Sequence, residues 1–285
     1  MKGRIKNFNS APLPFQGQKR AFVSLFRAAL EDIKEKREIK VIVDLFGGSG
    51  LLAHHAKRIF PESKVVYNDY DNYCRRLLNV DRTNQLLSDF RAILNGFPYK
   101  ARLPLKLVRR ILPRVEKEEE TGFVDYITIS NALLFSTKYV ASYEELSAST
   151  MYNCVVKFGY QFDPAEYLNG LQIVRQDYFE LFNEYKDTPD VLFLVDPPYL
   201  TIDTKTYNSN QYWKLKDYLN VLRVLKDTNY FFFTSNKSSL LDICKWFEQN
   251  YNMTNPFAGS IVHSRKNMPT GFSSYTDMMI YKFNT

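Results

Sequence analysis

The stretch KVIVDLFGGSG, residues 40–50, decides the fold class. Its first half is a short apolar run, as expected of a buried strand, and its second half is a glycine-rich turn. Residues 51–60 then have helical spacing, and residues 64–68 (KVVYN) form a second apolar run. Short strands that alternate with helices predict an α/β fold with a parallel, doubly wound sheet.

The same alternation returns in the second half of the chain. Further strands are predicted at 171–176, 191–195, 230–235 and 275–283, and helices at 20–36, 178–186, 211–226 and 238–249. In between, the pattern weakens into basic, charged and then Ser- and Tyr-rich sequence. We therefore expect one α/β domain built from residues 1–85 and 169–285, with an inserted subdomain at 86–168.

The bulk properties narrow the class of protein. A formal charge of +7 over 285 residues favours phosphate-bearing partners such as nucleic acid. The three cysteines, Cys74, Cys154 and Cys244, stand far apart, which argues against a disulfide framework or a zinc site and favours a reducing cytoplasm. The sequence has neither a signal-peptide pattern nor an apolar run of bilayer length, so no membrane association is expected.

The glycine-rich turn and the acid after the next strand indicate a nucleoside cofactor. Glycines at 47, 48 and 50 let the chain turn tightly and let a ligand approach the backbone. Asp69, at the end of the second strand, can accept hydrogen bonds from both ribose hydroxyls. A looser form of the dinucleotide fingerprint is also present, with Ala53 at its last position. This pair of features therefore leaves NAD and S-adenosylmethionine both open.

The segment Asp196-Pro197-Pro198-Tyr199 directly follows the apolar run 191–195 and is the strongest chemical signal. Two prolines fix φ and remove two amide donors, so the Asp196 carboxylate and the Pro197 carbonyl are held as acceptors. An exocyclic NH2 group offers two donors to such a pair. Tyr199 supplies a flat face on which an extruded base can stack.

These motifs, with Pro14-Phe15-Gln16-Gly17-Gln18-Lys19 before them, resemble in kind and order the α-group (Dam-like, D12-class) DNA adenine N6-methyltransferases. The resemblance implies a Rossmann-like S-adenosylmethionine-dependent methyltransferase fold whose inserted middle region recognises the DNA target. It implies no metal, a catalytic role for Asp196 to Tyr199, and a cofactor site. The cofactor residues implied are Phe15, Lys19, Asp44, Phe46, Gly47, Gly48, Ser49, Gly50, Asp69 and Asp177. Among these, Asp69 would hold the ribose and Asp177 the cofactor's adenine amino group.

Basic residues in two places could contact the DNA backbone. Residues 100–114 contain no acid, and a second basic pair lies in what reads as a polar loop before the last strand. The predicted phosphate contacts on double-stranded DNA are Arg102, Lys106, Arg109, Arg110, Arg114, Arg265 and Lys266. A solvated face is the alternative for each group. A cognate restriction enzyme could be a further partner.

Other functions remain open from the sequence. An RNA or cytosine-N4 amino-methyltransferase would use a similar motif, although cytosine-N4 enzymes usually carry Ser where Asp196 stands. A catalytically silent nucleic-acid-binding protein of the same fold is another alternative, which the intact Asp44, Asp69 and Asp196 argue against. His54 and His55 are assigned to helix packing or surface.

Overall fold

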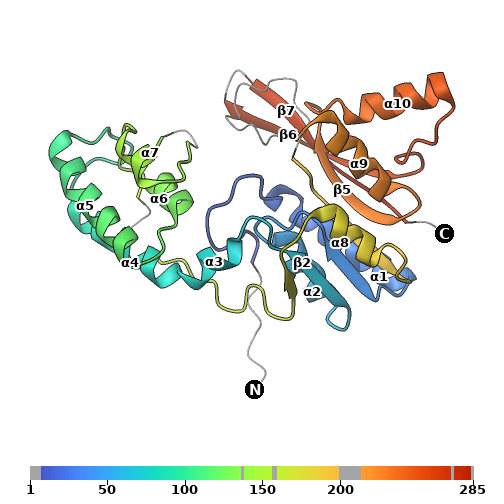
Figure 1. Cartoon of the computed structure of the whole chain (residues 1–285), viewed down its shortest axis with the longest axis horizontal. Helices are drawn as coiled ribbons and strands as arrows, with labels where there is room; N and C mark the ends of the chain where they lie inside the picture. The colour runs from blue at the N-terminus through green and yellow to red at the C-terminus, as the bar shows by residue number, and fades with distance from the viewer. Residues whose placement is uncertain (1–7, 136–137, 156–158, 199–212, 271–272, 284–285) are drawn as a thin grey trace. The chain divides into compact units, whose positions relative to one another are not determined.

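The computed structural model describes residues 8–135, 138–155, 159–198, 213–270 and 273–283. The chain forms two compact units. The helical unit comprises Met1–Gln18 and Asn72–Tyr167, and the sheet unit comprises Lys19–Asp71 and Leu168–Thr285. Both units are labelled by element in Figure 1.

The sheet unit contains one seven-stranded mixed sheet in the order β3-β2-β1-β4-β5-β7-β6. The first five strands in that order are mutually parallel, and β7 runs antiparallel between β5 and β6. The order 3-2-1-4-5 is that of doubly wound nucleotide-binding folds. In these folds the order in which strands are added to the sheet reverses between β1 and β4. The predicted α/β class is confirmed, and the architecture is consistent with the Rossmann-like methyltransferase fold. The strands are β1 (Val41–Asp44), β2 (Lys64–Asn68), β3 (Gln172–Val174), β4 (Val191–Val195), β5 (Asn229–Ser235), β6 (Ile261–Thr270) and β7 (Ser273–Lys282).

Helices cover both faces of this sheet, which is why its central strands β1, β4 and β5 are buried, largely apolar runs. In strand β5, successive side chains pack against helices on opposite faces of the sheet. Phe231 contacts Phe26 of α1, with ring centroids 4.9 Å apart, whereas Phe232 packs on the other face in a cluster that includes Val221 of α9. The helices of this unit are η1 (Arg20–Phe22), α1 (Val23–Lys36), α2 (Leu51–Ile59), α8 (Tyr178–Tyr185), α9 (Leu215–Leu225) and α10 (Leu240–Tyr251).

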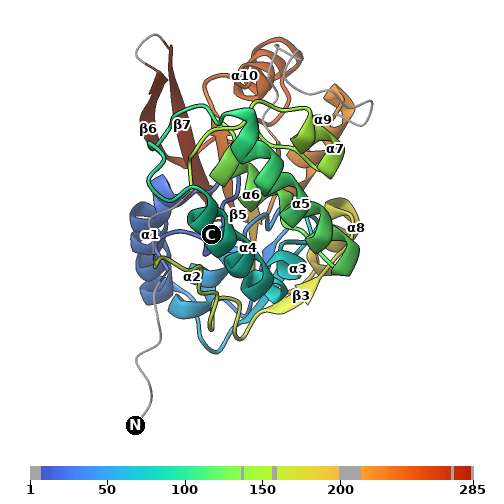
Figure 2. The same cartoon turned by 90° about the vertical axis from the view of Figure 1, so that its left-hand side faces the viewer.

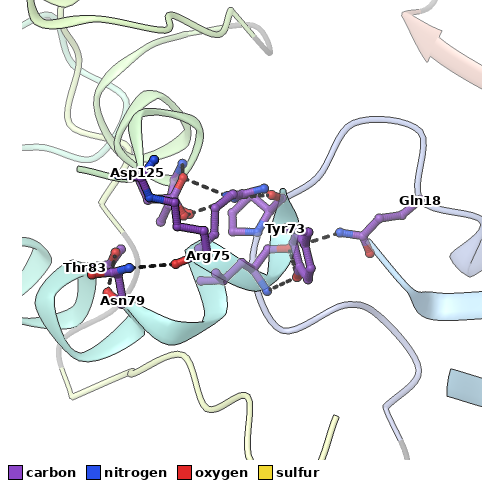
Figure 3. A network of polar contacts seen from close by, with 10 residues as sticks. Gln18, Tyr73, Arg75, Asn79, Thr83 and Asp125 are labelled. Atoms are coloured by element: carbon purple, nitrogen blue, oxygen red, sulfur yellow. Dashed lines mark hydrogen bonds and ion pairs between the residues drawn. The ribbon is translucent and has the colours of Figure 1, made fainter. Parts of the chain in front are cut away.

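The helical unit contains α3 (Tyr73–Leu78), α4 (Val80–Ile93), α5 (Leu105–Thr121), α6 (Tyr126–Leu133) and α7 (Tyr143–Ser147). A buried ion pair joins α3 to the start of α6, since Arg76 Nε donates to Asp125 Oδ1 at 2.9 Å. The same guanidinium donates to the Pro14 carbonyl at 2.7 Å. The Leu13 amide donates to the Tyr73 hydroxyl at 3.0 Å. These contacts, part of the network in Figure 3, fasten the N-terminal segment to α3.

The structure corrects two expectations about organisation. The middle of the chain is helical, and its compact unit begins at Asn72 and also takes in the N-terminal residues, whereas the predicted boundary at residue 86 falls inside α4. The predicted polar loop at Arg265 and Lys266 is wrong, because these residues belong to β6, which pairs with β7 (Figure 2). As an edge strand, β6 lacks the apolar run that marks the buried strands.

Among the described residues, no helix combines the length and apolar character that crossing a bilayer requires.

Candidate functional site

Four acids predicted for the site lie at or after the carboxyl ends of strands of the sheet unit. Asp44 ends β1, Asp69 and Asp196 directly follow β2 and β4, and Asp177 comes shortly after β3. In doubly wound sheets the carboxyl ends of the strands form the ligand-binding edge, and the crevice lies where the strand order reverses. Here that point lies between β1 and β4, between Asp44 and Asp196.

The glycine turn after β1 is required by its own packing. An added Cβ at Gly47 would collide with the ring of Tyr67 and lie 2.7 Å from the carbonyl oxygen of Asn68. Gly50 has a φ of 74° and forms the N-cap of α2, a backbone conformation that favours glycine. The Gly50 amide donates to the Gly47 carbonyl at 2.7 Å and closes the turn. Ser49 is buried within it.

Two residues that sequence reasoning missed hold this edge together. Asn68 Nδ2 donates to the Leu45 carbonyl at 3.0 Å and to the Gln176 carbonyl at 2.9 Å, so one buried amide links the ends of β1, β2 and β3. The Tyr67 hydroxyl lies 2.7 Å from the Gly48 carbonyl and 3.1 Å from Asp69 Oδ1. Tyr67 therefore ties the glycine turn to the predicted ribose acid. The sequence signal that could have identified Tyr67 and Asn68 is their position at the end of a strand, just before the acid Asp69.

Asp177 has a structural role at the start of α8, and its contact with the cofactor stays a prediction. Its Oδ1 accepts hydrogen bonds from the Phe179 amide at 2.8 Å and from the Glu180 amide at 3.3 Å, so it is the N-cap of α8. The next residue, Tyr178, packs against Phe46 with ring centroids 4.7 Å apart. Trp213 contacts both rings, at 5.3 Å and 5.6 Å. Phe46 of the predicted cofactor site thus belongs to a half-buried aromatic cluster that the sequence did not reveal.

The Asp196-Pro197 segment continues directly from the buried strand β4. Pro197 is buried and Pro198 is exposed. Burial raises the pKa of the Asp196 carboxyl above its usual range, the ammonium of Lys19 acts against that rise, and the charge of Asp277 adds to it. Asp196 is therefore an acid whose charge depends on its neighbours.

Lys19 supplies the positive charge beside this carboxylate. Its Nζ lies 2.6 Å from Asp196 Oδ2, and the two side chains are only 10% and 17% exposed. The backbone of Lys19 is fixed because its carbonyl accepts a hydrogen bond from the amide of Phe22, at 2.8 Å, and Phe22 is buried against Phe233. The sequence assigned Lys19 to the cofactor, whereas the structure pairs it with Asp196.

Asp44 is buried beside this pair. Neither of its oxygens meets hydrogen-bond geometry with a partner among the described residues. Burial, and then the charge of Asp196, raise its pKa to about 8, while the backbone amides of Ala53 and Phe46 and the charge of Lys19 oppose the rise. At neutral pH the Asp44 carboxyl therefore carries a proton for most of the time. Asp44 at the end of β1 and Asp196 after β4 therefore both interact with the Lys19 ammonium, while Asp277 of β7, which pairs with Ser235 at the end of β5, acts on Asp196.

Other predicted site residues are placed elsewhere or are not described. Phe15 belongs to the helical unit, where its ring meets Tyr73 at 5.7 Å. Tyr199 lies outside the described residues. Arg265 and Lys266 are exposed and adjacent in strand β6, so their side chains point to opposite faces of the sheet. Within the described residues, no group of three or more His, Cys, Asp or Glu is arranged to hold a metal ion.

Most of the basic middle residues form one face of α5. Lys106, Arg109, Arg110 and Arg114 are all exposed, and their spacing of three and four places them on the same side of the helix. The opposite side is anchored by the buried Ile111 and Val115. Arg114 also approaches Asp89 at 3.8 Å. Arg102, which precedes the helix, is exposed as well. Its backbone forms an isolated antiparallel β-bridge with that of Tyr152.

Comparison with known proteins gives one informative relative. No protein-family model matches the chain. A Haemophilus influenzae protein named "Putative methyltransferase" is 34% identical over 285 residues, which is 98% of this chain and 94% of that protein. A solved structure, the precorrin-6y C5,15-methyltransferase of Geobacter metallireducens, covers 99% of both chains at 10% identity, with a TM-score of 0.34. That structural likeness is too low to support an argument.

Proposed function

The chain belongs to the methyltransferase family of the Haemophilus influenzae protein, and we propose that it methylates N6 of adenine in double-stranded DNA. The single observation that carries this proposal is the end of β4. There the Asp196 carboxylate and the Pro197 backbone follow a fully buried strand at the point where the strand order reverses. Two acceptors at that point suit an exocyclic amino group, which has two hydrogens to donate.

Membership of a methyltransferase family implies S-adenosylmethionine as the methyl donor, and the residues present fit it. The cofactor bears positive charge on its sulfonium and on its amino group, and the carboxyl groups of Asp44 and Asp196 lie at the ends of β1 and β4, with Asp277 of β7 as a further acid acting on Asp196. Asp69 would hold the ribose, beside the glycine turn that Tyr67 supports. When bound, the cofactor supplies an electrophilic methyl group.

The residues of the chain would activate and orient the amine that accepts the methyl group. The lone pair of adenine N6 is delocalised into the ring, so the amine is a weak nucleophile. Hydrogen bonds from N6 to the Asp196 carboxylate and the Pro197 carbonyl would favour a pyramidal nitrogen whose lone pair is directed out of the ring plane. The ionised carboxylate would also stabilise the positive charge that develops on nitrogen. Fixed orientation of the amine contributes the rest.

DNA is the proposed substrate because of the basic face of α5. Four exposed cations on one side of a helix can follow a phosphate backbone without reading bases. The target adenine must leave the duplex, which costs a few kcal/mol, and stacking on Tyr199 would offset part of that cost.

The test of this proposal is the identity of the product. We would incubate the purified protein with methyl-labelled S-adenosylmethionine and genomic DNA that lacks adenine methylation, and in parallel with RNA. Digestion to nucleosides and mass spectrometry would follow. Labelled N6-methyldeoxyadenosine is expected. Label in N4-methylcytosine or only in RNA would replace the proposal with the corresponding alternative. Cofactor and DNA binding without any label would favour the catalytically silent protein.

A further inference from the structure

The ion pair of Lys19 and Asp196, whose side chains are mostly shielded from water, has a function that neither the family nor the sequence motifs assign. We propose that Lys19 is the positioning residue for Asp196: its ammonium holds the carboxylate ionised and in one orientation, ready to accept hydrogen bonds from the target amine. This inference rests on the proposed function of Asp196. It replaces the expectation that Lys19 contacts the cofactor.

The geometry is that of a fixed ion pair. Nζ and Oδ2 are 2.6 Å apart, and both side chains are largely removed from water, where a charge-assisted hydrogen bond is stronger than at the surface. Both partners are attached to rigid elements. Lys19 is fixed through η1, whose residue Phe22 packs on Phe233 of β5, and Asp196 continues from β4. Strands β4 and β5 are adjacent in the sheet, so the segments that carry the two partners are anchored on neighbouring strands.

The charges around Asp196 show why an ammonium is needed there. Asp44 at the end of β1 and Asp277 on β7 are the neighbouring acids. Burial and like charges both disfavour a carboxylate: burial and the charge of Asp277 raise the pKa of Asp196, and the charge of Asp196 in turn raises the pKa of Asp44. Lys19 is the cation that acts on both Asp44 and Asp196. Without it, the rise in the Asp196 pKa that burial and Asp277 cause would be larger.

Protonation of Asp196 would weaken it as a hydrogen-bond acceptor and remove its negative charge. A protonated carboxyl presents a hydrogen from one oxygen, so it can no longer accept through both oxygens. It would also lack the negative charge that stabilises the positive nitrogen formed on methyl transfer. Lys19 therefore acts on the reaction through Asp196, and it need not touch the amine or the cofactor.

The variant Lys19→Met tests this, because it keeps an unbranched side chain and removes the charge. Lys40→Met is the matched control, since Lys40 also forms an ion pair, with Asp190 at 3.1 Å, but on the surface. The first readout does not depend on activity: the pKa of Asp196 in the cofactor-free protein, from carbon NMR of labelled aspartates, with Asp196→Asn to assign the signal. We expect Lys19→Met to raise this pKa by at least one unit and Lys40→Met to leave it unchanged.

The second readout is the pH dependence of methyl transfer. In Lys19→Met the acid limb of the profile of kcat against pH should move to higher pH, by as many units as the pKa of Asp196 rises. On the acid side of that limb kcat should fall by up to about tenfold for each unit by which the pKa rises, and it should recover at higher pH, while the Kd for S-adenosylmethionine stays within about threefold. Lys19→Arg, which restores a charge, should restore the wild-type limb. An unchanged Asp196 pKa in a folded Lys19→Met protein would overturn the proposal, as would a loss confined to cofactor affinity.

The two readouts separate this proposal from the proposed substrate. If the wild-type protein methylates no DNA but the NMR shift is observed, the substrate assignment fails and the role of Lys19 stands. If DNA is methylated and the NMR shift is absent, the substrate assignment stands and the proposed role of Lys19 fails. Should Lys19→Met fail to fold, the same measurement on Lys19→Gln, which keeps a polar group without charge, decides the matter.

Discussion

Asn68 and Gln176 hydrogen-bond to each other twice: Asn68 Nδ2 donates to the Gln176 carbonyl at 2.9 Å, and the Gln176 amide donates to Asn68 Oδ1 at 3.1 Å. The two residues are 108 positions apart in sequence. Each immediately precedes an acid assigned to the cofactor, Asp69 in one case and Asp177 in the other. This reciprocal pair therefore fixes the separation of the two acids, as one rigid site for a nucleoside would need.

The assignment of Asp69 to the cofactor ribose gives a first prediction. Asp69→Ala should weaken S-adenosylmethionine binding, because each missing hydrogen bond to a charged acceptor costs about 1.5–3 kcal/mol. Asp71→Ala is the control, since Asp71 is exposed and only two positions away. Calorimetric titration of the two folded variants checks this. Equal affinities in both variants would remove Asp69 from the ribose site.

The buried Asp44 predicts a pH-dependent stability. Its pKa rises from 3.8 to about 8 on folding, mainly through burial. Between these values the native state binds a proton that the unfolded state has released, so the free energy of unfolding falls as the pH rises from about 4 to about 8. Asp44→Asn cannot ionise and should be more stable than the wild type at pH 8, by at least about 1 kcal/mol, given that one pKa unit is worth about 1.4 kcal/mol.

Denaturant unfolding at pH 5 and pH 8 checks the Asp44 prediction. The difference between Asp44→Asn and wild type should be small at pH 5 and large at pH 8. Asp32→Asn serves as control because Asp32 lies on the surface in an i,i+4 pair with Lys36. A stability difference that is the same at both pH values would show that Asp44 is ionised in the folded protein.

The basic face of α5 predicts the salt dependence of DNA binding. Replacing Arg109, Arg110 and Arg114 together by Gln should weaken binding to DNA of any sequence. The slope of log K against log salt should flatten by roughly 0.9 for each phosphate that the protein no longer neutralises. The matched control changes three exposed lysines of the sheet unit, Lys216, Lys226 and Lys245, to Gln. An unchanged slope in the arginine triple variant would make α5 an ordinary solvated helix.

The strand ends could be predicted because their signals are local. The apolar run before Asp44 and the one before Asp196 both mark buried parallel strands. A residue that directly follows such a strand lies at the binding edge of the sheet whatever the rest of the chain does. Asp44 and Asp196 could thus be identified from a few neighbouring residues each, whereas Asp277, within the antiparallel strand β7, could not.

The contacts between distant segments could not be predicted in this way. Nothing near Lys19 in sequence indicates that its ammonium meets Asp196, and nothing near Asn68 indicates its partner Gln176. Strand β6 was missed because an edge strand needs no apolar run. The packing of Tyr67 against Gly47, which leaves no room for a Cβ there, could not be predicted from the glycine turn alone. In each case the deciding information is the packing of segments far apart in the chain.

Methyl transfer by Asp196→Ala tests the central claim most directly. The measurement is a single turnover with labelled S-adenosylmethionine and DNA, made on variants shown to be folded and to bind the cofactor. We predict no detectable transfer by Asp196→Ala, since the amine then has no charged acceptor. Tyr199→Phe should keep most activity and Tyr199→Ala much less, because stacking is worth about 1–3 kcal/mol per base. Transfer by Asp196→Ala at the wild-type rate would contradict the assignment of this site to activation of the amino group.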